Sequence, residues 1–124
     1  MLICCVSPEN LAMSLHFFLK NLFERCAVAG EDTGLNEGIL ASTSTGVVTD
    51  DTWKCTANLE DGWSTCSFDD SHWLNANVYA ANGGWPWGGI NSIMDSAKWI
   101  WAEGSTDGTV YCRKRLRDCK LFVL

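Results

Sequence analysis

The sequence has little positive charge and no long apolar run, and each shortage excludes a class of protein. Nine basic residues stand against fifteen acidic residues, which gives a net charge of −6. Such a chain repels phosphate backbones and lacks the basic surface that nucleic-acid binding requires. No stretch approaches the roughly eighteen apolar residues of a membrane-spanning helix. We therefore expect neither a nucleic-acid partner nor a membrane span.

Residue types that build catalytic and metal sites are also scarce. The two histidines, His16 and His72, lie far apart in the sequence, and the cysteines include no C-x-x-C pair of the kind that binds zinc. The chain contains neither a nucleophile elbow nor a phosphate-binding loop. His72 is the one candidate for a general base. We expect no catalytic residue, no metal and no cofactor.

What the chain does contain is cysteine and apolar residues. With 124 residues, 47% of them apolar, it forms at most one domain and can bury roughly two thirds of its unfolded surface. Seven cysteines indicate an oxidising compartment, because cytosolic thiols are kept reduced. We therefore expect an extracellular or secreted setting. Seven is odd, so at least one cysteine is unpaired.

Residues 7–25 have a helical pattern. Ser7 can cap the helix, Pro8 fits its first position, and apolar residues recur at three- and four-residue spacing. The alternative is a signal peptide cleaved near residues 27–29, but no basic residue precedes the apolar run. We predict an amphipathic helix and place residues 1–26 outside the domain that follows. The apolar stripe either covers a sheet face or drives association.

The rest of the chain is predicted to form short strands. Residues 30–34 have the composition of a turn, and residues 104–108 are predicted to close a hairpin between the last two strands. Alternation places Trp99 and Trp101 on one face and Ile100 on the other. The predicted strands are residues 27–29, 38–44, 47–49, 53–56, 77–79, 97–102 and 110–116. Residues 117–124 form a tail that ends in four apolar residues, and it is either one more edge strand or disordered.

Seven tryptophans fall within residues 53–101, around the polar turn at residues 68–73. We expect Trp53, Trp73, Trp99 and Trp101 to be buried. The adjacent Asp69 and Asp70 could divide general acid and base roles. The stronger interpretation is structural: both can accept backbone hydrogen bonds and form a turn that lets the flanking aromatics enter the core.

Residues 82–89 are rich in glycine and cannot form a central strand. This loop contains Trp85 and Trp87, whose flat faces could stack on a sugar ring. Asn82 and a carboxylate such as Asp69 could supply the hydrogen bonds of such a site. The alternative is that both indoles are buried in the core.

A basic run occupies residues 113–117. It could form a targeting signal or a phosphate-binding patch. Alternation along a strand would instead distribute its charges over both faces. We therefore interpret it as a solvated strand.

Several short motifs together resemble the galactose-binding-like module, a jelly-roll β-sandwich found in extracellular animal proteins and as an ancillary domain of glycosidases. The resemblance covers roughly residues 27–116. It lies in residues 38–42, 49–55, 61–63, 68–73, 86–88, 97–101 and 110–113. In that family, strands precede the segment similar to residues 27–34, whereas here a helix is predicted, and residues 117–124 match poorly. The chain thus resembles the C-terminal part of the module, an incomplete jelly roll.

The resemblance implies a non-catalytic module of carbohydrate-binding or adhesion type, with a glycan or an extracellular protein as partner. It also implies a disulfide between Cys55 and Cys112, each of which has an apolar residue two positions earlier on the same face. The alternative is a structural interaction domain, or a fragment without a ligand. The ligand, the oligomeric state and the pairing of the other five cysteines stay open: Cys4, Cys5, Cys26, Cys66 and Cys119.

Overall fold

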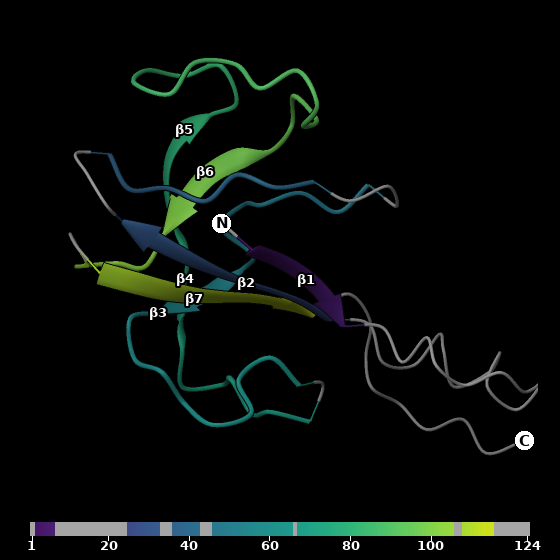
Figure 1. The fold of residues 1–124 in the computed structure, drawn as a ribbon, viewed down its shortest axis with the longest axis vertical. Coiled ribbons are helices and arrows are strands. Elements are labelled where there is room, and N and C mark those ends of the chain that lie inside the picture. The colour runs from purple at the N-terminus through teal and green to yellow at the C-terminus, as the bar shows by residue number, and fades with distance from the viewer. Residues whose placement is uncertain are drawn as a thin grey trace, which may run out of the picture.

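The computed structural model describes residues 2–6, 25–32, 36–42, 46–65, 67–105 and 108–115. These residues form seven β-strands and no helix, so the prediction of a mainly β protein is confirmed (Figure 1). The strands are β1 Leu2–Val6, β2 Arg25–Asp32, β3 Lys54–Thr56, β4 Leu74–Asn75, β5 Asn77–Ala81, β6 Lys98–Trp101 and β7 Gly108–Arg115. Nearly all of the predicted helix, and the tail at residues 117–124, lie outside the described residues.

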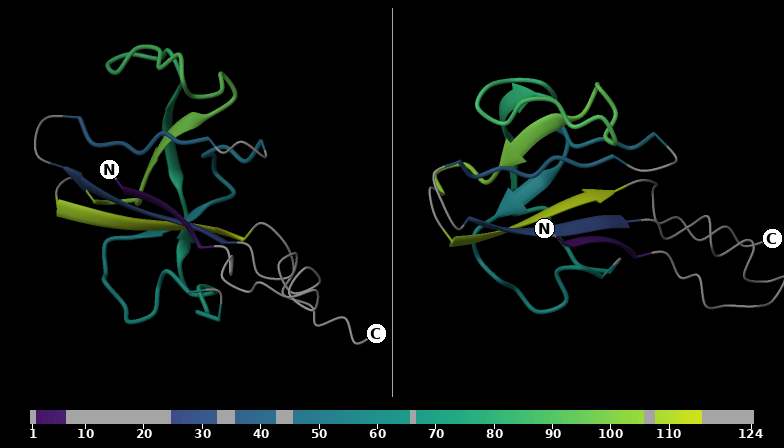
Figure 2. Two further views of the ribbon diagram at one scale, coloured as in Figure 1. Left: turned by 45° about the vertical axis from the view of Figure 1, so that its right-hand side comes forward. Right: turned by 45° about the horizontal axis from the view of Figure 1, so that its top comes forward.

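The strands form two antiparallel sheets, one of five strands in the order β1-β2-β7-β3-β4 and one of two strands, β5-β6. In Figure 2, right, the two-stranded sheet lies over the five-stranded sheet. β7 pairs with β2 over its whole length on one side and with β3 on the other. The predicted hairpin between the last two strands is therefore wrong, because β6 pairs with β5 and β7 belongs to the other sheet.

The N-terminal half of the five-stranded sheet differs from the sequence prediction. β2 begins at Arg25, the predicted end of the helix, and runs through residues 30–32, which were expected to turn. The reason is long-range pairing: Gly30, Glu31 and Asp32 each have a partner in β7. β1 pairs with the outer edge of β2 and was not predicted as a strand.

The core contains residues from both sheets. Ile100 and Trp101 of β6 are 0% and 1% exposed, so this strand is covered on both of its faces. Trp53 and Trp73 are also buried, as predicted, whereas Trp99 is only half-buried. The main buried cluster consists of Val28, Ile39, Trp53, Cys55, Ala76, Ile100, Trp101, Ala102, Val110 and Cys112. The cluster therefore brings together residues that lie between positions 28 and 112 of the sequence.

A disulfide links Cys55 of β3 to Cys112 of β7, which confirms the predicted pair. The two residues are register partners, and their Cα atoms are 4.1 Å apart. Closing a loop with a sequence separation of 57 stabilises the fold by about 4 kcal/mol in the chain-entropy model. Both cysteines lie in the core, at most 3% exposed, beside Trp53.

Candidate functional site

Asn82 organises the loop between β5 and β6, the green loop at the top of Figure 1. Its Nδ2 donates to the carbonyl oxygens of Ile93 at 3.0 Å and Ile90 at 3.2 Å, and its Oδ1 accepts a hydrogen bond from the Ile90 amide at 2.9 Å. A third carbonyl, of Met94, lies 3.4 Å from the same Nδ2. The side-chain amide therefore bonds to the loop's own backbone and holds residues 82–94 in one conformation.

The two indoles of this loop have different environments. Trp85 is 89% exposed, the most exposed of the large apolar residues that the structure describes. Trp87 is half-buried and stacks on Trp99, with ring centroids 4.8 Å apart and planes at 17°. Its Nε1 donates to the Asn36 carbonyl at 3.3 Å. The alternative in which both indoles enter the core is thus excluded for Trp85.

Tyr79 of β5 extends the stack on Trp87. Its ring is parallel to the Trp87 ring within 3°, at a centroid distance of 6.4 Å. Burial raises the pKa of the Tyr79 hydroxyl, and the Glu37 carboxylate beside it raises the pKa further. The hydroxyl donates to Glu37 Oε1 at 3.4 Å. Trp87 is therefore fixed by two aromatic neighbours, whereas Trp85 projects from the same loop.

Asp69 lies at the other end of the molecule, in the teal loop between β3 and β4 at the bottom of Figure 1. Its Oδ1 accepts a hydrogen bond from the Ser71 amide at 3.0 Å, and the Trp73 amide donates to the Asp70 carbonyl at 3.0 Å. Hydrogen bonds from the Ser71 side chain and backbone lower the pKa of Asp69. The polar turn at residues 68–73 thus has the structural hydrogen bonds that the sequence predicted.

Arg113 is a residue whose role the sequence did not reveal. It was expected on a solvated strand, but it is 1% exposed, and its Nε lies 3.0 Å from Asp70 Oδ2. Its guanidinium also donates to the carbonyl oxygens of Trp63, Thr65 and Phe68. The interpretation of residues 113–117 as solvated is therefore wrong for Arg113, because the β3–β4 loop folds over it.

Glu60 connects the same loop to the polar turn. Nε2 of His72 lies 2.9 Å from Glu60 Oε1, and Trp73 Nε1 donates to that oxygen at 2.8 Å. These two side-chain hydrogen bonds lower the pKa of Glu60. His72 and Glu60 are both partly solvated, at 56% and 36% side-chain exposure.

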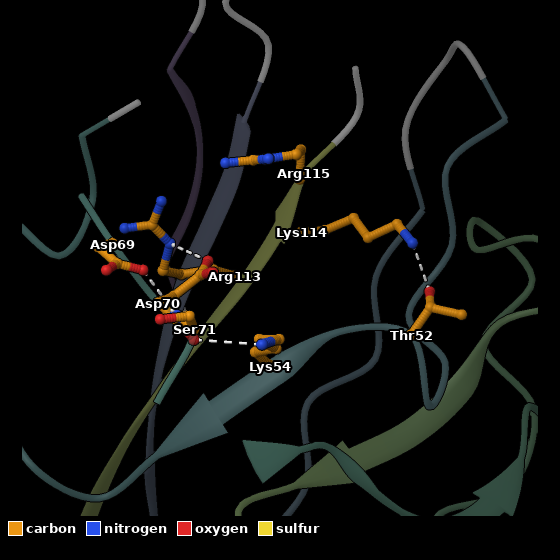
Figure 3. Close-up of a pocket in the computed structure, with 8 residues that line it drawn as sticks. All are labelled: Thr52, Lys54, Asp69, Asp70, Ser71, Arg113, Lys114 and Arg115. Carbon is orange, nitrogen blue, oxygen red and sulfur yellow. Dashed lines mark hydrogen bonds and ion pairs between the residues drawn. The ribbon is translucent and has the colours of Figure 1, made fainter. Parts of the chain in front are cut away.

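The four predicted ligand-binding residues do not meet in one site. Asn82, Trp85 and Trp87 share the β5–β6 loop, whereas Asp69 belongs to the β3–β4 loop at the opposite end (Figure 1). Asp69 lines a separate cavity of about 420 Å³ beside β7 (Figure 3). Within the described parts of the chain, no group of His, Cys, Asp and Glu is suited to hold a metal ion, and no helix could cross a membrane.

The comparison with known proteins finds likeness to part of a glycosidase. Over 58 residues the chain is 40% identical to an α-L-rhamnosidase from Streptomyces avermitilis. This segment is 46% of the chain but only 6% of the length of the rhamnosidase. No family model and no solved structure matches the chain. The likeness is compatible with an ancillary domain in a carbohydrate-related protein.

Proposed function

We propose that the chain is a non-catalytic carbohydrate-binding module of the galactose-binding-like, jelly-roll type, acting in an extracellular setting. The two antiparallel sheets and the buried disulfide support this type of module. The likeness to a segment of an α-L-rhamnosidase supports a carbohydrate as the ligand. Because that segment is such a small part of the rhamnosidase, the proposal concerns binding and not hydrolysis.

The proposal depends on one observation, which is that the indole of Trp85 is exposed on an ordered loop. An indole at 89% exposure presents a flat apolar surface to water, and covering that surface with an apolar partner is favourable. The apolar face of a sugar ring is a suitable partner, because it stacks on an aromatic plane while its hydroxyls stay solvated. Asn82 and the Trp87–Trp99 stack hold the loop, so little conformational entropy is lost when Trp85 binds.

The proposal gives Trp85 the stacking contact and gives Trp87 and Asn82 the task of fixing the loop. Trp87→Ala and Asn82→Ala are therefore expected to change the loop as well as any binding. Trp85→Ala is the informative variant, because removing an exposed side chain leaves the core intact.

The test is a screen of the folded chain against a glycan array that includes L-rhamnosides and galactosides, followed by calorimetric titration of the best ligand. We expect Trp85→Ala to weaken binding at least about tenfold, since a central aromatic contact dominates small interfaces. The matched control is Leu59→Ala, which removes another exposed apolar side chain, 67% exposed, from the β3–β4 loop. Absence of any glycan ligand, or equal binding by both variants, would leave the structural interaction domain as the better description.

A further inference from the structure

A second candidate site is the cavity beside β7, shown in Figure 3. It lies where β7 continues beyond its last partner in β3, Lys54, which pairs with Arg113. Residues 69–71 of the β3–β4 loop form its other side. Its volume of about 420 Å³ is within the range of sites that hold a small molecule.

The cavity is locally basic in an acidic protein. Four of the chain's nine Lys and Arg residues line it, against two carboxylates, although the net charge of the chain is −6. Arg113 is already engaged by Asp70 and by loop carbonyls. The remaining lining charges are three cations and the single carboxylate of Asp69, so the cavity attracts anions.

Lys54 and Arg115 are the cations that face the loop. The Lys54 ammonium donates one long hydrogen bond, 3.3 Å, to the Asp70 carbonyl, and an ammonium has three N–H donors. Arg115 is exposed, and no hydrogen bond or ion pair with another described residue occupies its guanidinium. In Figure 3 that guanidinium extends toward the side of Asp69 and Asp70, whereas Lys114 extends the other way, to Thr52. A guanidinium and an ammonium that line the same cavity are donors that can bind an oxyanion.

Asp69 restricts which anion fits. Its hydrogen bonds to Ser71 favour the ionised form, which can only accept hydrogen bonds. A compact dianion such as phosphate would be repelled by this carboxylate. A ligand with one negative charge and neighbouring hydroxyls would satisfy both sides, its charge held by Lys54 and Arg115 and its hydroxyls donating to Asp69.

We propose that this cavity binds a hydroxylated carboxylate of the acidic-sugar class, such as a uronic acid, through Arg115, Lys54 and Asp69. The site is independent of the proposed function, because β7, β3 and the β3–β4 loop line it, whereas Trp85 belongs to the β5–β6 loop at the top of Figure 1. An acidic sugar and a neutral glycan could therefore bind at the same time.

The test is a titration of the ¹⁵N-labelled full chain with D-glucuronate, D-glucose and inorganic phosphate at low ionic strength, followed by amide chemical shifts. Glucuronate is expected to shift the amides of residues 69–71 and of β7 with saturation, and to bind at least about tenfold more tightly than glucose or phosphate. Arg115→Gln and Lys54→Gln should each weaken glucuronate binding by about tenfold, because each removes a charged hydrogen bond. The same titration with Trp85→Ala should match the parent, which separates this proposal from the stacking site.

The matched control is Lys98→Gln, which removes an exposed cation from β6, outside the cavity lining, and should leave the glucuronate affinity within about twofold. Thermal melting of each variant checks that Arg115→Gln and Lys54→Gln remain folded. Should Lys54→Gln unfold, Arg115→Gln alone decides, since the Arg115 side chain is exposed. Equal affinity for phosphate and glucuronate, or unchanged glucuronate binding by Arg115→Gln, would overturn the proposal and leave only a non-specific anion patch.

Discussion

Nε of Arg113 lies 3.0 Å from Oδ2 of Asp70, and this ion pair joins β7 to the loop between β3 and β4. The Arg113 side chain is 1% exposed and that of Asp70 is 17% exposed. The guanidinium carbon also lies 4.8 Å from the centroid of the Phe68 ring and 6.0 Å from that of Trp73. A single cation thus holds the backbone, a carboxylate and two aromatic rings of the loop.

Arg113→Met is therefore expected to destabilise the protein by about 3–5 kcal/mol, because it removes the cation that pairs with a partly buried carboxylate and donates to several carbonyls. The measurement is the free energy of unfolding from urea titration. Arg115→Met, two residues further along β7 and exposed, should change that free energy by less than about 0.5 kcal/mol. If the two variants unfolded at the same urea concentration, the ion pair would not hold the loop.

Trp73→Ala is expected to cost about 3–5 kcal/mol, since it removes a large side chain that is 5% exposed and packs on Phe68. Trp85→Ala is the matched control, because the same atoms are removed from a site that is 89% exposed. Thermal unfolding followed by circular dichroism should show a large drop in Tm for Trp73→Ala and little change for Trp85→Ala. A Trp73→Ala variant that melts like the parent would mean that the turn at residues 68–73 does not anchor the core.

We expect Glu60 to make the folded protein less stable in acid. The hydrogen bonds from His72 and Trp73 lower its pKa in the folded state, so the ionised carboxylate favours folding. This contribution is present above the ordinary glutamate pKa of about 4.3 and is lost as the pH falls through the lower folded-state pKa. The difference in unfolding free energy between the parent and Glu60→Gln should therefore be largest above pH 4.3 and shrink below it.

The control for this pH dependence is Glu103→Gln, which changes an exposed glutamate in the turn after β6. Its free energy of unfolding should differ little from that of the parent, because its side chain is exposed. A Glu60→Gln difference that did not narrow in acid would show that the hydrogen bonds of Glu60 do not depend on its charge.

The parts of the fold that could be predicted are those that local patterns determine. Alternation around Trp99 and the β-prone residues near Tyr79 marked β6 and β5, and the aspartates after Phe68 marked the turn, because each signal lies within a few residues of the structure it specifies. The Cys55–Cys112 pair came from the resemblance together with the apolar residues that share their faces.

The parts that could not be predicted depend on residues far apart in the sequence. A short glycine-containing connection normally favours a hairpin, but β7 pairs with β2 along its whole length and with β3 at residues 111–113, and β6 pairs with β5 instead. The burial of Arg113 depends on carbonyls 45 to 50 residues earlier. Nothing local distinguishes this arginine from its exposed neighbour Arg115.

The candidate site likewise has features that the sequence predicted and features that it could not predict. The composition of residues 82–89 indicated a loop that carries indoles, and Trp85 is indeed exposed. The sequence could not show that the Asn82 side-chain amide donates hydrogen bonds to carbonyls eight to twelve residues later. It also could not show that Asp69 belongs to a loop at the other end of the fold. Those facts follow from how the loops are placed by the two sheets.

Gly30 shows why a turn-like composition was misleading. It lies within β2, and a Cβ built on it would be 2.8 Å from Cγ1 of Ile39 and 3.0 Å from Cζ3 of Trp101. Glycine is needed there because the opposite layer approaches the backbone, not because the chain turns.

Gly30→Ala is therefore expected to destabilise the protein by about 1–3 kcal/mol, the usual cost of inserting a methyl group into a packed core. The Ile39 side chain can move slightly, but the Trp101 ring is buried and has less freedom. Gly89→Ala is the matched control: the nearest atom to its added Cβ is 3.8 Å away, so its unfolding free energy should stay within about 0.5 kcal/mol of the parent. Urea unfolding of the two variants measures the difference. If Gly30→Ala were as stable as Gly89→Ala, β2 would have room for a side chain at this position. The two layers would then be less closely packed than the contacts of Ile39 and Trp101 indicate.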